Sequence, residues 1–194
     1  GSGAASNNRS VTYNYMDSTT ERPIWTTSSL ARSTWADSAI FGKPHGTEYD
    51  SSATSDATVG NTEGVTTYYE HETGTNQIKA GATTAISASI QSGDFDLDQR
   101  GLAGDGEYMM KIRRVIPDFL SQTGASRVTL NLKNYPTDTE ASSSLGPFEV
   151  DSDTTKIDTR ARARAIALKV DNTSITQHWK LGTFRLDIQP DGRR

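Results

Sequence analysis

The chain has 194 residues, of which 33% are hydrophobic and 23% charged, and its formal net charge is −4. The absence of cysteine excludes disulfides, thiolate zinc sites and thiol catalysis. A mildly acidic chain without a basic block has no electrostatic means of gripping DNA unaided, and no apolar run approaches the length of a membrane span. The many Ser, Thr, Gly and Asp residues favour a loop-rich β protein.

Short strands are predicted through the first half of the chain. In residues 9–16 (RSVTYNYM), Val11, Tyr13 and Tyr15 alternate with polar residues, a pattern that indicates a half-buried strand. Trp and Tyr residues recur on or beside these runs, and we expect most of them in the core and about a third at interfaces. Further strands are predicted over residues 24–27, 66–72 and 84–92.

Two segments of this half interrupt the strand pattern. Residues 43–64 contain almost nothing apolar, which predicts a mobile insertion loop at the surface. Residues 29–40 place Leu30, Trp35 and Ala39 near helical spacing, but the same residues also fit a turn and a strand that carries Trp35 inward. The sequence leaves both interpretations open.

The second half alternates more regularly. In residues 126–134 (SRVTLNLKN), Val128, Leu130 and Leu132 occupy one face and polar residues the other. Strands at intervals of eight to twelve residues are typical of a β-sandwich. We therefore predict an all-β fold of antiparallel sheets, with a strand-rich unit over residues 1–92 and a β-sandwich over residues 93–194. The strands expected in this half cover residues 107–116, 126–134, 148–150, 154–160, 160–170 and 179–189.

The densest acidic cluster follows Gly93. Asp94, Asp96, Asp98 and Asp105 resemble the carboxylates of a calcium loop, but Gln99 stands where that loop needs glycine, and the twelfth position is Asp105 rather than glutamate. A strand running into a glycine-rich turn is the better interpretation. We predict no calcium site here, and no metal or cofactor anywhere in the chain.

Nothing in the sequence favours catalysis. His45, His71 and His178 are far apart and show no ligand spacing. The chain has no nucleophile elbow, phosphate-binding loop or zinc-protease helix. We therefore predict a protein without enzymatic activity and without a small-molecule substrate.

The segment RARARAIALKV, residues 160–170, is the most unusual. At a period of two, Arg160, Arg162 and Arg164 share a face with Ile166, while the opposite face is flat with alanines. The arginine row fits either a solvated strand end or a row of carboxylates or phosphates. Because Asp residues flank the row on both sides, we predict that it serves a subunit interface and does not grip DNA. Those carboxylates are Asp151, Asp153, Asp158 and Asp171.

The end of the chain resembles a known family. The arginine-alternating run, the spacing Trp179–Gly182–Arg185 and the terminal PDGRR resemble the C-terminal end of the tail nozzle, or packaged-DNA stabilisation, proteins of short-tailed bacteriophages (podoviruses). Other runs are similar to that family and follow the same order, so the resemblance spans most of the chain. They are LARSTW (30–35), YYEHETG (68–74), VIPDF (115–119), residues 128–136 and Gly-Pro-Phe (146–148).

This resemblance implies that residues 1–92 are the closing blade or blades of a β-propeller, most of which precedes residue 1, and that the rest is a β-sandwich. Family members are structural virion proteins that form a tube, usually of six copies, which continues the portal channel and retains packaged DNA. The implied partners are other copies, neighbouring tail or portal-adaptor proteins, and DNA that passes without specific binding; no membrane is involved. The implied location is the phage tail, assembled in the host cytoplasm.

The residues expected at the subunit interface are Arg160, Arg162, Arg164, Trp179 and Arg185. The serine-rich stretch over residues 49–62 and the short chain depart from the family pattern. Two other functions fit the composition: a glycan-binding adhesin domain of a virion, which would need exposed tryptophans such as Trp25 or Trp179, and a capsid cement protein.

Overall fold

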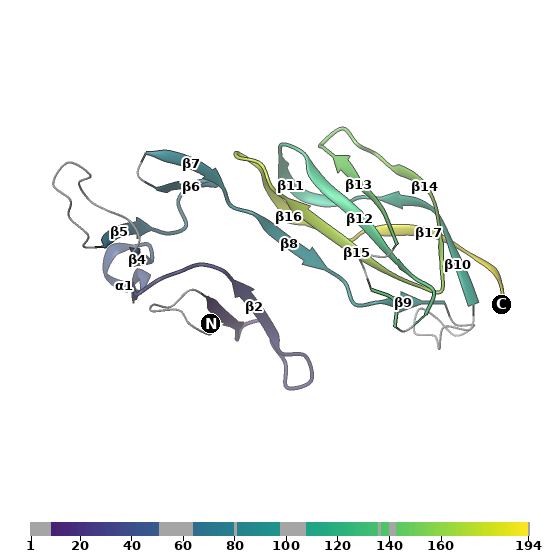
Figure 1. The fold of residues 1–194 in the computed structure, drawn as a ribbon, viewed down its shortest axis with the longest axis horizontal. Helices are drawn as coiled ribbons and strands as arrows, with labels where there is room; N and C mark the ends of the chain where they lie inside the picture. Colours follow the sequence, from purple (N-terminus) through teal and green to yellow (C-terminus); the bar gives the residue numbers. More distant parts are fainter. Residues whose placement is uncertain are drawn as a thin grey trace. The chain divides into compact units, whose positions relative to one another are not determined.

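The computed structural model describes residues 9–50, 64–79, 81–97, 108–135, 137–139 and 143–193. Nearly all regular structure is antiparallel strand, so the predicted all-β class is confirmed. Contacts divide the chain into two compact units, Gly1–Gly74 and Thr75–Arg194 (Figure 1). Within the described residues, no helix is both long and apolar enough to cross a membrane.

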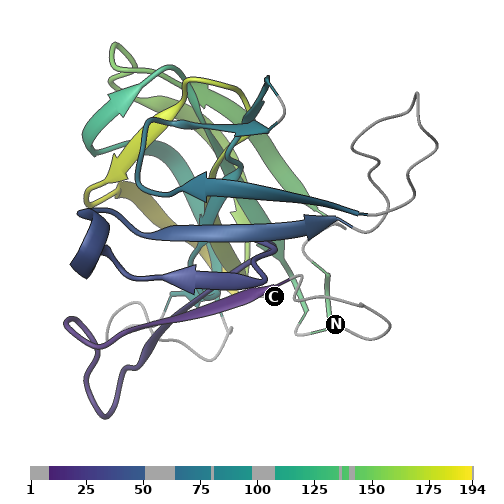
Figure 2. The same ribbon diagram turned by 90° about the vertical axis from the view of Figure 1, so that its left-hand side faces the viewer.

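The first unit contains two small sheets. β1 (Ser10–Asn14) pairs with β2 (Ile24–Ser28), and β4 (His45–Asp50) lies between β3 (Thr34–Ala36) and β5 (Val65–Glu70). Figure 2 shows the second sheet in shades of blue. The short helix α1 (Ser38–Phe41) connects β3 to β4. Asp37 caps it by accepting a hydrogen bond from the Ser38 amide at 2.6 Å, and Gly42 ends it with a φ of 76°.

Two predictions for this unit need correction. The loop expected over residues 43–64 is wrong for His45–Asp50, which form the central strand of a sheet; residues 51–63 lie outside the described part of the chain. Residues 29–40 form neither a long helix nor a strand that buries Trp35. They contain β3 and the first residues of α1, and Trp35 is 56% exposed.

The described part of the first unit has almost no hydrophobic core. Among its described residues, Tyr69 is the only buried hydrophobic side chain. The strand predicted there is confirmed by β1, but Val11 and Tyr13 are 65% and 45% exposed, so the expectation that one of its faces is buried is wrong. The expectation that most aromatic residues are core is also wrong, because Tyr15, Trp25, Trp35, Tyr49 and Tyr68 are exposed.

The second unit contains two larger sheets. In one, β10 (Tyr108–Ile116) lies between β14 (Ile157–Ala163) and β17 (Arg185–Arg193). In the other the order is β13 (Ser144–Val150), β12 (Ser126–Lys133), β15 (Ala165–Asn172) and β8 (Ala88–Gln91). β9 (Phe95–Asp96) also pairs with β15. Two smaller pairs are β6 (Asn76–Lys79) with β7 (Ala82–Ala85), and β11 (Phe119–Thr123) with β16 (His178–Leu181).

One core lies between these sheets. Met110 and Ile112 from β10 and Leu130 and Ile166 from β12 and β15 are fully buried in the same cluster. The predicted boundary near Gly93 differs from the division at Gly74, because β8 pairs with β15 and therefore belongs to the second unit.

The segment RARARAIALKV is not one strand. Residues up to Ala163 pair with β10, whereas Ala165 and later residues pair with β12, so the chain passes from one sheet to the other at Arg164. Ala161 and Ala163 are buried in the core. The expected shared face of Arg160 and Ile166 is therefore wrong. The expected alanine face is also divided, because Ala161 and Ala163 pack in the core whereas Ala165 and Ala167 lie across from Lys133 and Asn131 in the other sheet.

Candidate interface on the outer face of the β14–β10–β17 sheet

Cationic side chains gather on the outer face of the β14–β10–β17 sheet. β10 is its central strand, so a side chain of β10 points either into the core or away from it. Ile112 and Val115 are both fully buried although they are three positions apart. A bulge in the pairing between Ile112 and Arg114 explains this change of phase. The bulge leaves Arg113 and Arg114 on the outer face, next to Lys111.

The neighbouring strands extend this surface. Arg160 and Arg162 of β14 are exposed because they alternate with the buried Ile157, Ala161 and Ala163, and Arg185 of β17 is also exposed. Lys111 lies directly across from Arg162 in the strand register. We call the whole set the basic face, and it comprises Lys111, Arg113, Arg114, Arg160, Arg162 and Arg185.

Three carboxylates partly neutralise the basic face. Arg114 Nε donates to Asp158 Oδ1 at 3.0 Å, and Lys156 binds the other oxygen of Asp158 at 3.0 Å. Hydrogen bonds from Lys156 and then Arg114 hold the pKa of Asp158 below its ordinary value. Arg162 forms an ion pair with Asp191 of β17. With Asp187, which lies across from Arg114, the face carries six cations and three carboxylates.

Four cations of the basic face have no such partner. The side chains of Lys111, Arg113, Arg160 and Arg185 make no ion pair or hydrogen bond with any other residue that the structure describes. Like charges directly across a sheet, such as Lys111 and Arg162, destabilise the isolated protein. A surface of this kind can bind carboxylates or phosphates of a partner.

The structure therefore separates the five predicted interface residues. Arg160, Arg162 and Arg185 share the basic face. Arg164 lies at the crossing between the sheets, where its backbone amide donates to the Lys133 carbonyl at 3.1 Å. Trp179 is half-buried against the core.

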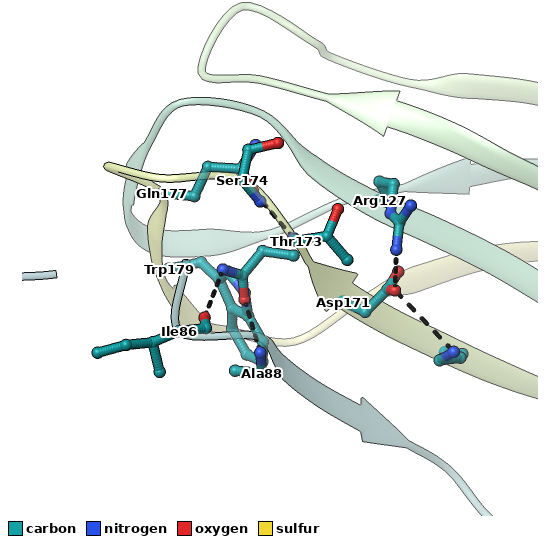
Figure 3. Close-up of polar contacts among 10 residues, drawn as sticks. Ile86, Ala88, Arg127, Asp171, Thr173, Ser174, Gln177 and Trp179 are labelled. Carbon is teal, nitrogen blue, oxygen red and sulfur yellow. Dashed lines mark hydrogen bonds and ion pairs between the residues drawn. The ribbon is translucent and has the colours of Figure 1, made fainter. Parts of the chain in front are cut away.

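Trp179 is held inside the second unit by Asn172, which is 3% exposed. The Trp179 indole donates to Asn172 Oδ1 at 3.1 Å (Figure 3). The same oxygen accepts from the Ala88 amide at 3.2 Å, and Asn172 Nδ2 donates to the Ile86 carbonyl at 3.1 Å. Next to it, Asp171 forms an ion pair with Arg127 (Figure 3). These contacts fasten β8 to β15 and give Trp179 a structural role.

Gly182 also has a structural role. A Cβ on Gly182 would lie 2.9 Å from both Cγ and the carbonyl oxygen of Asp118, where real Cβ atoms essentially never lie. The amides of Gly182 and Thr183 donate to the Asp118 carbonyl and carboxylate at 2.8 and 3.1 Å. This junction joins the β10–β17 pair to the β11–β16 pair.

In the first unit, the runs LARSTW and YYEHETG come together. Arg32 Nε donates to His71 Nε2 at 3.0 Å, and the Arg32 guanidinium lies 3.9 Å from the centre of the Tyr69 ring. The Trp35 and His71 rings are 4.7 Å apart. Arg32 also pairs with Glu48 at 3.5 Å, and Glu48 accepts from the Tyr69 hydroxyl at 3.0 Å. We call these five residues the Arg32 cluster.

Only part of the acidic run after Gly93 is described. Asp94 forms an ion pair with Lys133 at 2.7 Å, whereas Asp98, Gln99 and Asp105 lie outside the described residues. The prediction about calcium is therefore untested. In the part of the chain that is described, no three His, Asp or Glu residues form a group that could hold a metal ion.

One sequence pattern indicates the basic face, although the predictions above did not include it. In the run MMKIRRVI, the apolar residues Met110, Ile112 and Val115 break strict alternation, and cations fill the positions between them. Such a break indicates a bulge that puts two consecutive arginines on one face. Which other cations join them depends on the pairing of β10 with β14 and β17, and that pairing is not visible in the sequence.

Comparison with known proteins adds no assignment to this geometry. No protein-family model matches the chain, and no curated protein matches it significantly.

Proposed function

We propose that this chain is a non-enzymatic structural component of the tail of a short-tailed bacteriophage. In this proposal it forms part of the nozzle that continues the portal channel and retains packaged DNA. It packs against other copies in a ring of six and against neighbouring tail or portal-adaptor proteins, and DNA passes without specific binding. The specific assignment rests on the resemblance described above.

The observation that supports a packing role is the small number of buried hydrophobic side chains in the first unit compared with the number that are exposed. Its described part buries one hydrophobic side chain, whereas eleven large hydrophobic side chains there are exposed. Large exposed apolar surfaces mark sites of contact with other proteins. Trp25, for example, is 58% exposed with its ring 4.5 Å from that of Tyr13.

The residues that carry the resemblance have structural positions, which supports a structural protein. Trp179 and Gly182 fasten strands of the second unit, and Arg32 and His71 belong to the Arg32 cluster. Arg185 lies on the basic face. Four of these residues therefore stabilise the fold, and Arg185 contributes to a surface.

Locating the chain in an intact virion tests the proposal. A density map of the tail, or immunogold labelling with an antibody against residues 75–194, should place the chain around the channel below the portal. Labelling of the capsid shell would instead support a cement protein. Labelling of peripheral tail fibres or spikes would support an adhesin.

A glycan-binding domain is the second candidate, and the exposed Tyr13–Trp25 pair favours it. Exposed aromatic rings are suited to the apolar faces of sugars. Trp179 no longer supports this function, because its indole is bound to Asn172. If the chain binds host polysaccharide and Trp25→Ala abolishes binding while Trp179→Phe preserves it, the adhesin is the better assignment.

A further inference from the structure

We propose that the basic face binds the exposed acidic turn between β13 and β14 of a second copy of this chain, in a head-to-tail contact. This inference rests on the proposed function and names the surfaces through which the copies would join. The acidic turn comprises Asp151 and Asp153 of this connection together with Glu149, the penultimate residue of β13. All three residues are exposed.

The acidic turn matches the basic face in charge and is well defined in shape. Asp151 Oδ1 accepts from the Thr154 hydroxyl at 2.7 Å and from the Asp153 amide at 3.1 Å. Neither Glu149 nor Asp153 forms an ion pair with any residue in the described ranges. A turn already held in shape loses little conformational entropy when it binds.

The charges also decide the kind of contact. Two basic faces placed against each other across a two-fold axis would bring like charges together. A copy must therefore present a different surface to the basic face, and such a heterologous contact generates a ring or a filament. The face and the turn belong to the same compact unit, so one copy offers both halves of the contact.

The carboxylates within the basic face favour a protein partner over DNA. Asp158, Asp187 and Asp191 lie among the cations and would repel phosphates. Arg114 and Arg162 already bind carboxylates of the same chain on this surface. The carboxylates of a neighbouring turn would bind the cations that lack a partner, Arg113 and Arg160 among them.

Charge reversal tests the contact in the full chain. The face variant is Arg113→Glu with Arg160→Glu, and the turn variant is Glu149→Lys with Asp153→Lys. We expect the unchanged chain to self-associate and each variant to raise the dissociation constant by roughly 30-fold or more. Because the variants are complementary, an equimolar mixture should associate again. Sedimentation velocity over a concentration series measures all four samples, and raising the salt from about 0.05 M to about 0.5 M should weaken association.

A matched control separates this contact from the effect of net charge. Arg9→Glu with Arg22→Glu changes the charge by the same amount at exposed sites of the first unit and should leave association unchanged. Circular dichroism and thermal melting establish that every variant folds. A chain that stays monomeric, or a mixture that fails to associate, overturns the inference. If the chain is located in the tail but the face variant still assembles normally, the inference is wrong and the proposed function stands.

Discussion

The two units of this protein are both built from antiparallel strands, but different interactions stabilise them. In the described part of the second unit, eleven buried hydrophobic residues from two sheets form one cluster, and twelve partly buried hydrophobic side chains pack against it. The first unit buries Tyr69 alone among its described hydrophobic residues and is held by the polar and aromatic contacts of the Arg32 cluster. A core like that of the second unit supports folding without a partner, since burial of apolar surface is the dominant favourable term in the free energy of folding.

The difference has a consequence for assembly. A unit whose aromatic side chains face solvent gains stability when another protein covers them. In the described part of the second unit, Tyr135 is the only aromatic residue among the exposed large hydrophobic side chains. This unit also offers charged surfaces, which contribute to specificity and rate of association. We therefore expect the second unit to be a rigid platform and the first unit to depend on its surroundings.

The largest effect should come from the core of the second unit. Leu130 is fully buried, so Leu130→Ala should lower the free energy of unfolding by about 2–5 kcal/mol. Val11 in the first unit is 65% exposed, and Val11→Ala should change it by less than about 0.5 kcal/mol. Urea unfolding followed by circular dichroism measures both. Equal effects of the two substitutions would contradict the comparison.

A smaller loss is expected at the strand junction of the second unit. Gly182→Ala would force a Cβ against the backbone and carboxylate of Asp118, which should cost about 1–3 kcal/mol. Gly93→Ala is the matched control, because a Cβ there meets nothing within 4 Å. Thermal melting should separate the two variants clearly; identical melting temperatures would show that the junction tolerates a side chain.

In the first unit, replacing Arg32 tests how much the Arg32 cluster contributes to stability. The Arg32 side chain is 9% exposed, and Arg32→Met would remove the donor to His71 and the cation that pairs with Glu48. The local cost should be about 1–3 kcal/mol. Hydrogen exchange should become faster in β3, β4 and β5 while β10 and β12 remain protected. Arg22→Met, at an exposed position, is the control, and faster exchange throughout the chain would argue against two separate units.

The smallest expected effect is a response to pH that is confined to the first unit. Burial, followed by the charge of Arg32, lowers the pKa of His71 from its ordinary value of 6.5. The unfolded chain then binds this proton more readily than the folded chain, so the stability that neutral His71 contributes is present above pH 6.5 and is lost as the pH falls from there. Protonation would also remove the acceptor of the Arg32 hydrogen bond.

Hydrogen exchange at about pH 7.5 and about pH 5.5, corrected for the intrinsic rate, measures this response. β3–β5 should lose protection at the lower pH, and β10–β17 should not. The lowered pKa values of Glu70, Asp151 and Asp158 start from 4.5 and 3.8, so these carboxylates do not respond in this range. His71→Gln should remove the dependence, and its persistence would assign the response to another group.

Much of the second unit could be predicted from the sequence. Strict alternation in residues 126–134 placed Val128 and Leu130 in the core, and the structure buries both completely. Such alternation reports a strand with one buried face, because successive side chains point to opposite sides. The same rule misled in the first unit. Val11 and Tyr13 alternate equally well, yet no layer covers them within the described part of the chain, and alternation does not show whether one exists.

The strand class and the amphipathic local runs could be predicted from the residues alone, because both depend on neighbours along the chain. Which residues meet depends on how the strands pair. This pairing broke residues 160–170 at Arg164, buried alanines of this run, and joined Arg160 to Lys111 and Arg113 on one surface. It also made His45–Asp50 a central strand although that segment has no apolar alternation. The physical reason is that strand pairing and register are contacts between segments distant in sequence, and they fix the face to which each side chain belongs.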